Sequence, residues 1–543
     1  MNHLPVLPVL LPVLTAVLLL LIGDHGGDAR GGHGHRKLRW ARALSVGSAL
    51  AGLLIAARLV AFADGGELLV YRLGDWPAPF GIVLVVDRLS ALLLLLTACV
   101  ALPVLWYAAG GWDAHGRHFH ALFHFQLMGL NGAFVTGDLF NLFVFFEVLL
   151  IASYVLLLHG QGRERYRAGV HYVVLNLAAS ALFLVGVALI YAFTGTLNFA
   201  DLALRVPRVS GAEAGVLQAA ALVLLVVFGF KAALVPLALW LPATYAAASA
   251  PVAALFAIMT KVGVYAIVRV HGVVFGDSGG ASALVVQPLL LPLLLPLALA
   301  TCALGVTGAL AAHSLPRLVA WLTVASVGTI LAAIGLFGVA AWGAALYYLA
   351  HSTLVIAGLF LLAELVAAQR GDAGGRLEPA SPVAQPALLG TLLLLAAASN
   401  AGLPPLPGFI GKLMILEASS SHPWAAAVWS VVLLAGFFTL VGLARAGSIL
   451  FWHTRADAPG SASGASPRLV AATVALLGAG VAMSVFAAPL QRYTLDAARQ
   501  LGDRAAYARA VLPETGGERA VTTRPYRVTP PRTPPPTPQE VPR

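Results

Sequence analysis

Apolar runs separated by short polar breaks dominate the sequence from its start to about residue 500. A membrane-spanning helix needs roughly 20 apolar residues, and this pattern predicts about fourteen transmembrane helices. Their centres are expected near residues 13, 51, 95, 128, 149, 182, 228, 262, 293, 328, 354, 401, 438 and 478. Charged residues make up only 10% of the 543, which excludes a soluble protein of this length. We therefore predict an all-α integral membrane protein.

Alternate polar breaks are rich in arginine, and this alternation predicts how the spans are oriented. The first apolar run, residues 4–22, has no basic flank before it and no cleavage site, so we expect a retained helix rather than a signal peptide. Basic loops favour the cytoplasmic side, and with fourteen spans both termini then lie outside. The arginines assigned to the inside are Arg30–Arg42, Arg117, Arg163, Arg165, Arg167, Arg317, Arg370, Arg376, Arg455 and Arg468.

The spans divide into segments whose boundaries follow the longer polar breaks. The net charge of +10 comes largely from loops and from the C-terminal tail, so it reflects the orientation of the chain in the membrane rather than binding to nucleic acid. The tail is rich in proline and arginine and has too few large apolar residues for a core, so we expect it to be disordered. The expected segments are an N-terminal three-helix segment (1–110), two five-helix repeats (118–275 and 281–455), a last helix (466–490) and the tail (503–543).

Prolines interrupt two of the predicted spans. Lys231 precedes the break in the seventh span, and Lys412 follows the break in the twelfth. Proline removes a hydrogen-bond donor and clashes with the preceding turn, so each span should be a broken helix. The breaks lie five spans apart. Because this number is odd, the two units enter the membrane in opposite directions, as the halves of an inverted repeat do. Paired broken helices at corresponding positions of such repeats indicate a transport site. The interrupting prolines are Pro236 in the seventh span and Pro404, Pro405 and Pro407 in the twelfth.

Lysine is rare in this chain, and its positions are unusual. Among 33 basic residues only four are lysines, and Lys231, Lys261 and Lys412 lie inside apolar runs, whereas Lys37 is in a polar stretch. Arginine keeps its proton in a protein, but a buried lysine can lose it. Ionisable groups within a membrane are costly and usually functional. The three buried amines therefore predict a proton path.

Glu147 lies in the fifth predicted span, with no other charge between Asp138 and His159. An isolated carboxylate there would be costly. We expect Glu147 to pair with Lys231 and to modulate its proton affinity; the alternative is a structural ion pair.

Three further residues are candidates for the same path. Lys261 lies on the span after Lys231, near the same depth, so the two amines are expected to exchange a proton. Lys412 is expected to exchange protons with one face of the membrane, and His351 to link it to Lys261. Alternatives remain open for each: Lys261 could extend to the interface, Lys412 could bind carbonyls freed by the break, and His351 could be an ordinary core histidine.

Other chemistry is not indicated. Cys99 and Cys302 both fall in apolar runs, so neither a disulfide framework nor a metal cluster is expected. The sequence has no metal-ligand spacing, P-loop, dinucleotide fingerprint or nucleophile elbow. We therefore expect no catalytic residues and no bound cofactor.

These motifs resemble the proton-conducting antiporter-like family shared by Mrp-type Na⁺/H⁺ antiporters and the membrane arm of respiratory complex I. The likeness covers roughly residues 80–455 and is most specific in GDLFNLFVFFEVLLIASYVLLL, FGFKAALVPLALWLPATY and GLPPLPGFIGKL. It implies fourteen helices with inverted five-helix repeats. The family's functional glutamate then falls on Glu147, and its lysines fall on Lys231, Lys261 and Lys412. The match is greatest to the D subunit of Mrp antiporters.

One departure from the family affects the middle of the path. Ile356 stands where such proteins commonly carry a lysine, a few residues after His351. The resemblance implies a proton-translocating subunit of a Na⁺/H⁺ antiporter in a bacterial inner membrane, with other membrane subunits as partners. A proton-pumping subunit of an NADH-quinone oxidoreductase or membrane hydrogenase is the alternative, and a proton-coupled bicarbonate-uptake subunit is a third possibility.

Overall fold

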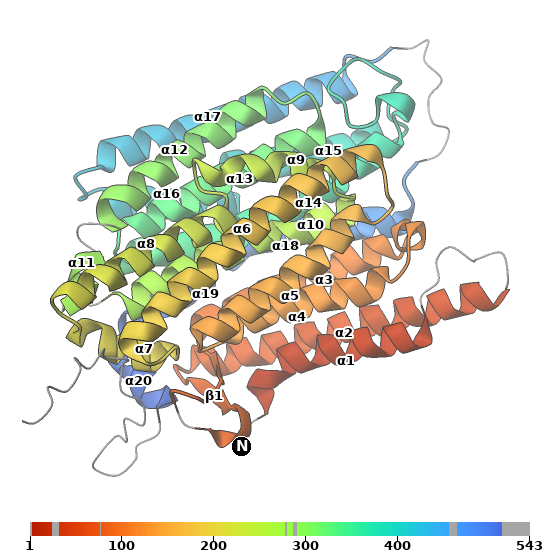
Figure 1. Ribbon diagram of the computed structural model, residues 1–543. Helices are drawn as coiled ribbons and strands as arrows, with labels where there is room; N and C mark the ends of the chain where they lie inside the picture. The colour runs from red at the N-terminus through yellow and green to blue at the C-terminus, as the bar shows by residue number, and fades with distance from the viewer. Residues whose placement is uncertain are drawn as a thin grey trace, which may run out of the picture.

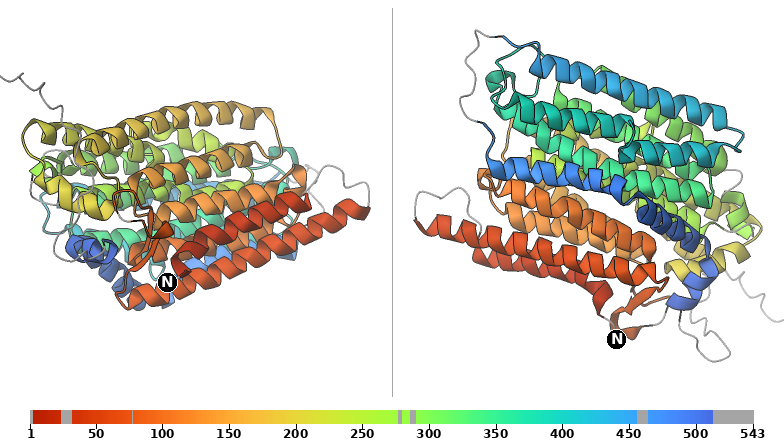
Figure 2. Two further views of the ribbon diagram at one scale, coloured as in Figure 1. Left: turned by 60° about the horizontal axis from the view of Figure 1, so that its bottom comes forward. Right: turned by 180° about the vertical axis from the view of Figure 1, so that it is seen from behind.

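Long apolar helices lie side by side and nearly parallel, forming a thick slab (Figure 1). The computed structural model describes residues 3–23, 32–76, 78–276, 280–285, 290–455 and 464–512. One end of the slab carries a two-stranded hairpin, the short helices α7 and α20, and the beginning of the described chain; we call it the hairpin end (Figures 1 and 2). Arg42, Asp113 and the start of α6 lie at the opposite end, which we call the arginine end.

The N-terminal helices pack beside a small hairpin. In the hairpin, Leu69 pairs with Val86 and Arg72 with Val83 in antiparallel register. Asp87 follows the hairpin and caps the next helix by accepting the Ser90 N–H at 2.8 Å. The elements are η1 (Leu4–Val6), α1 (Leu7–Ile22), α2 (Gly32–Asp64), β1 (Leu69–Arg72), η2 (Leu73–Asp75), β2 (Val83–Val86), α3 (Arg88–Ala108) and η3 (Trp112–His115).

The next group of helices contains the first break. The cap of α5 is Asp138, which accepts the N–H of Asn141, and the cap of α7 is Asn198. The elements are α4 (Phe119–Val135), α5 (Leu139–Leu158), α6 (Arg163–Thr194), α7 (Phe199–Arg205), η4 (Val206–Arg208), α8 (Ala212–Ala232), η5 (Leu237–Leu239), α9 (Trp240–Ala247), α10 (Ala250–Ala266) and a π-helix, η6 (Ile267–Val274).

The remaining helices contain the second break. Within this part α13 and α14 are almost wholly buried, whereas α17 and α18 lie at the periphery. The elements are α11 (Gly280–Val285), α12 (Leu291–Leu310), α13 (Leu315–Gly335), α14 (Val339–Ala368), η8 (Gly371–Ala373), α15 (Pro386–Ala401), α16 (Pro407–Ser419), α17 (Ala425–Phe451), α18 (Pro467–Val485), α19 (Ala487–Gly502) and α20 (Arg504–Val511).

All fourteen predicted centres lie in these helices, which confirms the all-α membrane fold. Twelve helices of the described chain are long and apolar enough to cross a membrane. The two remaining centres fall in α4, which has 17 residues, and in the pair α15–α16, which has 16 and 13. The arrangement into two inverted repeats stays a prediction.

Both expected breaks are present. The helix α8 ends at Ala232, and Ala233 takes a left-handed conformation with φ of 65° before Pro236. The helix α15 ends at Ala401, followed by Gly402 with φ of 90°, and α16 begins at Pro407. Proline is favourable at the first position of a helix, where no hydrogen-bond donor is needed.

The C-terminal boundary differs from our expectation. We expected the disordered tail to begin at residue 503, but Arg504–Val511 form α20. Asp503 caps this helix by accepting the Ala506 N–H at 2.9 Å, and Tyr507, Ala508 and Val511 are buried. The rest of the predicted tail, residues 513–543, and Arg30 in the predicted basic loop lie outside the described residues.

Candidate functional site

Lys231 is buried at the end of α8, immediately before the first break. Its ammonium donates a hydrogen bond of 2.9 Å to Oδ1 of Asn176 on α6. The Asn176 amide group donates to the Tyr172 carbonyl at 2.8 Å, which directs Oδ1 toward the lysine. The rings of Phe146 and Phe230 lie 6.0 and 5.9 Å from the ammonium. The charge is therefore held by a neutral acceptor and by aromatic faces.

Glu147 lies on α5 and contacts a different residue of the same helix α6. Its carboxylate accepts a hydrogen bond from the hydroxyl of Ser180. Within the described segments, the expected direct ion pair between Glu147 and Lys231 is not formed. The reason is that Asn176 and Ser180, one turn apart on α6, each take one of the two charged groups. Glu147 and Lys231 still attract each other electrostatically across this face of α6.

Lys261 lies on α10 and has no exposed surface. Its ammonium donates to the Thr260 hydroxyl at 3.2 Å. Gly263 lets α10 approach α8 closely: a Cβ at Gly263 would lie 2.5 Å from the amide nitrogen of Ala232, beside Lys231. The two lysines therefore lie on helices whose backbones touch.

Lys412 lies on α16 and joins the two halves of the second broken helix. Its ammonium donates to the carbonyls of Asn400 at 3.0 Å and Ala401 at 2.7 Å. These carbonyls end α15, where a helix has no internal donors left to satisfy them. The contact is the one we considered as the alternative to a proton-transfer role, and it places the amine at the break itself.

His351 lies beside the second break, close to Lys412. It is fully buried on α14, beside the backbone of Ser399 near the end of α15. A Cβ at Gly408 of α16 would lie 2.8 Å from its Nε2. His351 therefore belongs with Lys412, whereas Lys261 belongs with Lys231.

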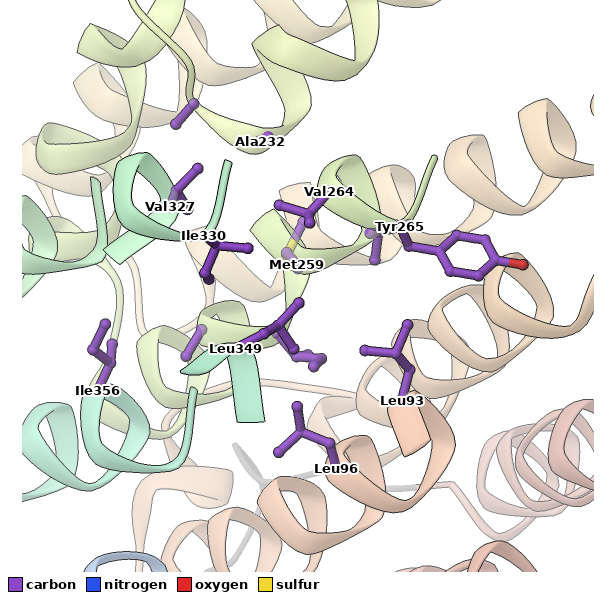
Figure 3. Close-up of a cluster of buried hydrophobic side chains, with 14 of the residues drawn as sticks. Leu93, Leu96, Ala232, Met259, Val264, Tyr265, Val327, Ile330, Leu349 and Ile356 are labelled. Atoms are coloured by element: carbon purple, nitrogen blue, oxygen red, sulfur yellow. The ribbon is translucent and has the colours of Figure 1, made fainter. Parts of the chain in front are cut away.

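An apolar cluster of buried side chains lies among α3, α10, α13 and α14 (Figure 3). Met259 comes from α10, Val327 and Ile330 from α13, and Ile356 from α14. Ile356 has no exposed surface. The position where the family commonly carries a lysine is thus occupied by a buried apolar side chain, which cannot carry a proton between Lys261 and His351.

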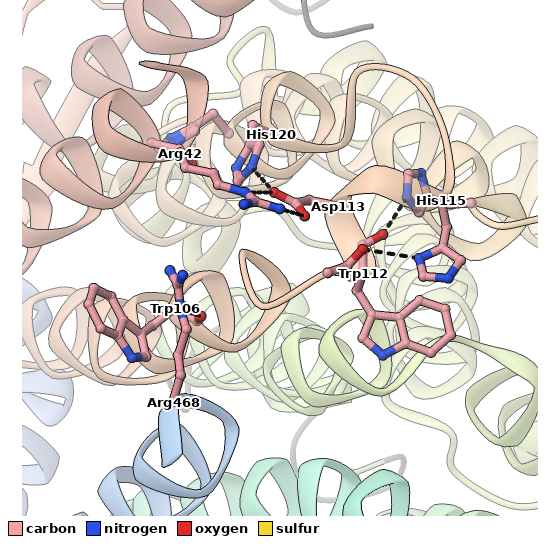
Figure 4. Close-up of polar contacts among 11 residues, drawn as sticks. Arg42, Trp106, Trp112, Asp113, His115, His120 and Arg468 are labelled. Atoms are coloured by element: carbon pink, nitrogen blue, oxygen red, sulfur yellow. Dashed lines mark hydrogen bonds and ion pairs between the residues drawn. The ribbon is translucent and has the colours of Figure 1, made fainter. Parts of the chain in front are cut away.

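A second polar cluster lies at the arginine end, apart from the lysines (Figure 4). Arg42 of α2 donates two hydrogen bonds, of 2.6 and 2.7 Å, to the carboxylate of Asp113. Asp113 also contacts Nε2 of His120 at 3.0 Å. Burial raises the pKa of Asp113, but the hydrogen bonds from Arg42 and His120 outweigh it and hold that pKa below its usual value. This cluster fastens the α3–α4 loop to α2.

Sequence reasoning missed two sets of residues. Asn176 and Ser180 stand four apart in an apolar run, a spacing that places them on one helix face and that could have identified them. Arg269 lies near the end of a predicted span and was not among the predicted site residues, yet it forms a buried ion pair with Asp87. Their separation of 182 residues gives no signal in the sequence.

Comparisons with known proteins agree with this arrangement. Residues 136–439 match the family described as NADH:quinone oxidoreductase/Mrp antiporter, transmembrane. The probable D subunit of a K⁺/H⁺ antiporter from Rhizobium meliloti is 42% identical, over 91% of this chain and 94% of its own length. The D subunit of a Na⁺/H⁺ antiporter from Alkalihalophilus pseudofirmus is 35% identical, over 95% of this chain and 100% of its own length.

Solved structures are similar over nearly the whole chain. A chain of the Mrp complex from a Dietzia species superimposes with a TM-score of 0.81 at 28% identity, covering 94% of this chain and all of that one. A chain of respiratory complex I from Thermus thermophilus gives a TM-score of 0.74 at 25% identity, covering 92% of this chain and all of that one.

Proposed function

The chain belongs to the NADH:quinone oxidoreductase/Mrp antiporter family of multi-pass membrane proteins, and we propose that it is the proton-translocating subunit of a multisubunit Na⁺/H⁺ antiporter. Its partners are other membrane subunits of the same complex, and its location is a bacterial inner membrane. The relatives named as D subunits of Na⁺/H⁺ and K⁺/H⁺ antiporters support this assignment.

The observation that carries the proposal is the set of partners of the three buried amines. Lys231 donates to an amide oxygen, Lys261 to a hydroxyl and Lys412 to two backbone carbonyls. None of these acceptors carries a charge, so the energy that favours the ammonium over the free amine is smaller than it would be beside a carboxylate. Such amines can release and regain a proton during transport.

Glu147 influences whether Lys231 is protonated or neutral. Its carboxylate attracts the ammonium across α6 without binding it. A movement of α5 relative to α6, or protonation of Glu147, would weaken this attraction and favour release of the proton from Lys231. The released proton would pass to Lys261, on the touching helix. We propose that His351 and Lys412 perform the corresponding exchange at the second break, and that the breaks at Pro236, Pro404, Pro405 and Pro407 expose both sites to a neighbouring amine or to water.

The proposal is tested with inverted membrane vesicles that contain the whole complex. Adding Na⁺ should dissipate a respiration-generated pH gradient in the wild type, and Lys231→Ala should abolish this response while the complex still assembles. Lys37→Ala, which changes the exposed lysine of α2, should leave exchange unchanged. Normal exchange in the Lys231→Ala complex would overturn the lysine path.

The same vesicles identify the cation and the type of complex. Responses to Na⁺, K⁺ and Li⁺ are compared, since the relatives are named for both Na⁺ and K⁺. An antiporter should exchange cations for protons when a pH gradient is imposed on the vesicles, even without respiratory substrates. If proton movement occurred only during electron transfer, and the purified complex contained redox subunits, the antiporter assignment would be wrong and the redox-driven alternative correct.

A further inference from the structure

A cavity of about 410 Å³ lies at the hairpin end of the slab. Exposed Arg499 and Asp503 line its rim, so it communicates with the surface. Its inner wall contains the side chains of Asp87 and Arg269, which are only 2% exposed. The cavity therefore ends on a buried ion pair.

Asp87 and Arg269 are tightly held together. Nη1 of Arg269 donates to the Asp87 carboxylate at 2.6 Å, and Nη2 donates to the Ser90 hydroxyl at 3.3 Å. Nε donates to the hydroxyl of Tyr265 at 3.3 Å, and Tyr265 in turn donates to the Phe134 carbonyl at 3.0 Å. Arg269 lies in the π-helix η6, a rare geometry that is frequent at functional sites.

The same helix connects this ion pair to a buried lysine. Lys261, Tyr265 and Arg269 are spaced by four residues each, which places them along one side of α10 and η6. At 1.5 Å per residue, Lys261 and Arg269 are about 12 Å apart along the helix axis, with Tyr265 halfway. In Figure 3 the Tyr265 hydroxyl points away from the apolar cluster.

Polar contacts thus continue from Tyr265 through Arg269 to Asp87, from the helix that carries Lys261 to the cavity. Ile356 and its apolar neighbours on α13 and α14 form no such chain of contacts. We propose that Lys261 exchanges protons with the hairpin-end cavity, and that the Asp87–Arg269 ion pair is the gate between them. This inference rests on the proposed function, because it names the exit of the same proton path.

The proton transfer balances without any other reactant. The Lys261 ammonium gives its proton, through water, to the Asp87 carboxylate, which leaves a neutral amine and a neutral carboxylic acid. Asp87 then releases the proton to water in the cavity and regains its charge. Arg269 cannot give up its own proton, so while it lies against Asp87 it keeps the carboxylate occupied. Separation of the pair opens the gate, and Tyr265 is a positioning residue that holds the guanidinium in place.

The helix α20 covers the mouth of this exit. The ring of Tyr507 lies 5.7 Å from the Arg269 guanidinium, and Ala506 lines the cavity beside it. Arg72 of the hairpin donates to the Val511 carbonyl at 3.0 Å and so fastens the end of α20. The last described helix therefore limits access to the gate from the hairpin end.

Charge removal at the gate is the first test, made in inverted vesicles containing the whole complex. Asp87→Asn should reduce cation-dependent exchange at least tenfold, because the amide cannot accept and release the proton. Asp201→Asn removes the charge of another ion pair at the same end, Asp201–Arg205 at 2.8 Å, and should leave exchange near the wild-type rate. Normal exchange in Asp87→Asn, with exchange still lost in Lys231→Ala, would overturn the gate and leave the proposed function intact.

Thiol labelling gives an independent test if Asp87→Asn fails to assemble. Cys99 and Cys302 are replaced by serine, and Ala506→Cys or Ala505→Cys is introduced separately in the full complex. Position 506 lines the cavity, whereas exposed position 505 does not. A charged methanethiosulfonate reagent applied at the hairpin end should slow exchange several-fold at position 506 and not at 505. Equal effects at both positions, or no effect at 506, would overturn the proposed exit.

Discussion

Asn176 accepts the hydrogen bond of Lys231 at 2.9 Å, in the place where a carboxylate would have fixed the ammonium. One turn further along α6, Ser180 takes the carboxylate of Glu147. The helix α6 thus keeps an acid and a base apart while both stay buried or half-buried. If Lys231 transfers a proton, as we propose, its release should be sensitive to a charge placed at position 176, because Asn176 is the direct acceptor of the ammonium.

Asn176→Asp is expected to slow exchange. Two unit charges 4 Å apart attract by about 4 kcal/mol at an effective dielectric constant of 20. A fraction of that energy would slow release of the proton by at least about tenfold, since each 1.4 kcal/mol is a factor of ten. Exchange is measured in vesicles with the complex quantified by immunoblot. Asn176→Gln keeps a neutral acceptor and should retain more activity than Asn176→Asp; the reverse order would contradict the argument.

Gly402→Ala is expected to disturb Lys412 directly. A Cβ at Gly402 would lie 2.9 Å from Cδ of Lys412, and φ there is 90°. The left-handed backbone alone costs a non-glycine residue roughly 1–2 kcal/mol. Gly371→Ala is the matched control, because Gly371 has φ of 56° but no atom within 4 Å of the added Cβ. Exchange should fall in Gly402→Ala and stay near normal in Gly371→Ala. Similar losses in both variants would mean that backbone strain is responsible rather than displacement of Lys412.

Ile356→Lys is expected to raise the passive leak of protons. An amine at position 356 would add an ionisable group to the apolar cluster that contains Ile356. Burying it also lowers stability, by several kcal/mol if it stays charged. Ile356→Met keeps the cluster apolar and serves as the control. The collapse of an imposed pH gradient without added cation is the measurement, and an unchanged leak in an assembled Ile356→Lys complex would show that this position does not limit proton movement.

Asp113→Asn is expected to destabilise the chain at neutral pH. Asp113 is fully buried but the Arg42 side chain is 26% exposed, so removing the carboxylate should cost less than the roughly 3–5 kcal/mol of a wholly buried pair. Since the folded state holds the pKa of Asp113 below its usual value, the carboxylate contributes stability above about pH 4, and that contribution is lost as the pH falls through the folded-state pKa. The wild type and Asp113→Asn should therefore differ less in Tm well below pH 4, under the folded-state pKa, than at pH 7.

An exposed ion pair provides the control for that measurement. Glu378→Gln removes a contact of 2.8 Å between half-exposed side chains, and such pairs contribute less than about 1 kcal/mol. Its Tm at pH 7 should stay close to that of the wild type. An equal loss of Tm in Glu378→Gln and Asp113→Asn would show that the buried cluster has no special role.

The sequence predicted the helices and the breaks because both arise from local chemistry. Runs of about 20 apolar residues form membrane spans, and Pro236 and Pro404 interrupt their helices whatever the surrounding tertiary structure is. Lys231, Lys261 and Lys412 were found because a charge in an apolar run is conspicuous.

The partners of these residues could not be predicted in the same way. Asn176 meets Lys231 from 55 residues away, and Asp87 meets Arg269 from 182 residues away, so each pair depends on how whole helices pack. We expected Glu147 to contact Lys231 because a buried carboxylate needs a partner, but a hydroxyl on α6 was sufficient. The helix α20 was missed because its eight residues are too polar to give an apolar run.

The contact of Lys412 with the end of α15 couples protonation to mechanics. Its ammonium lies at the negative end of the α15 dipole and donates to the last two carbonyls, so the charge–dipole part of this attraction exists only while the side chain carries its proton. Loss of the proton would leave neutral hydrogen bonds, which are weaker than those of the ammonium, between α15 and α16. If Lys412 titrates during transport, as we propose, a change of one charge would loosen the contact between α15 and α16 and allow the two helices to move relative to each other.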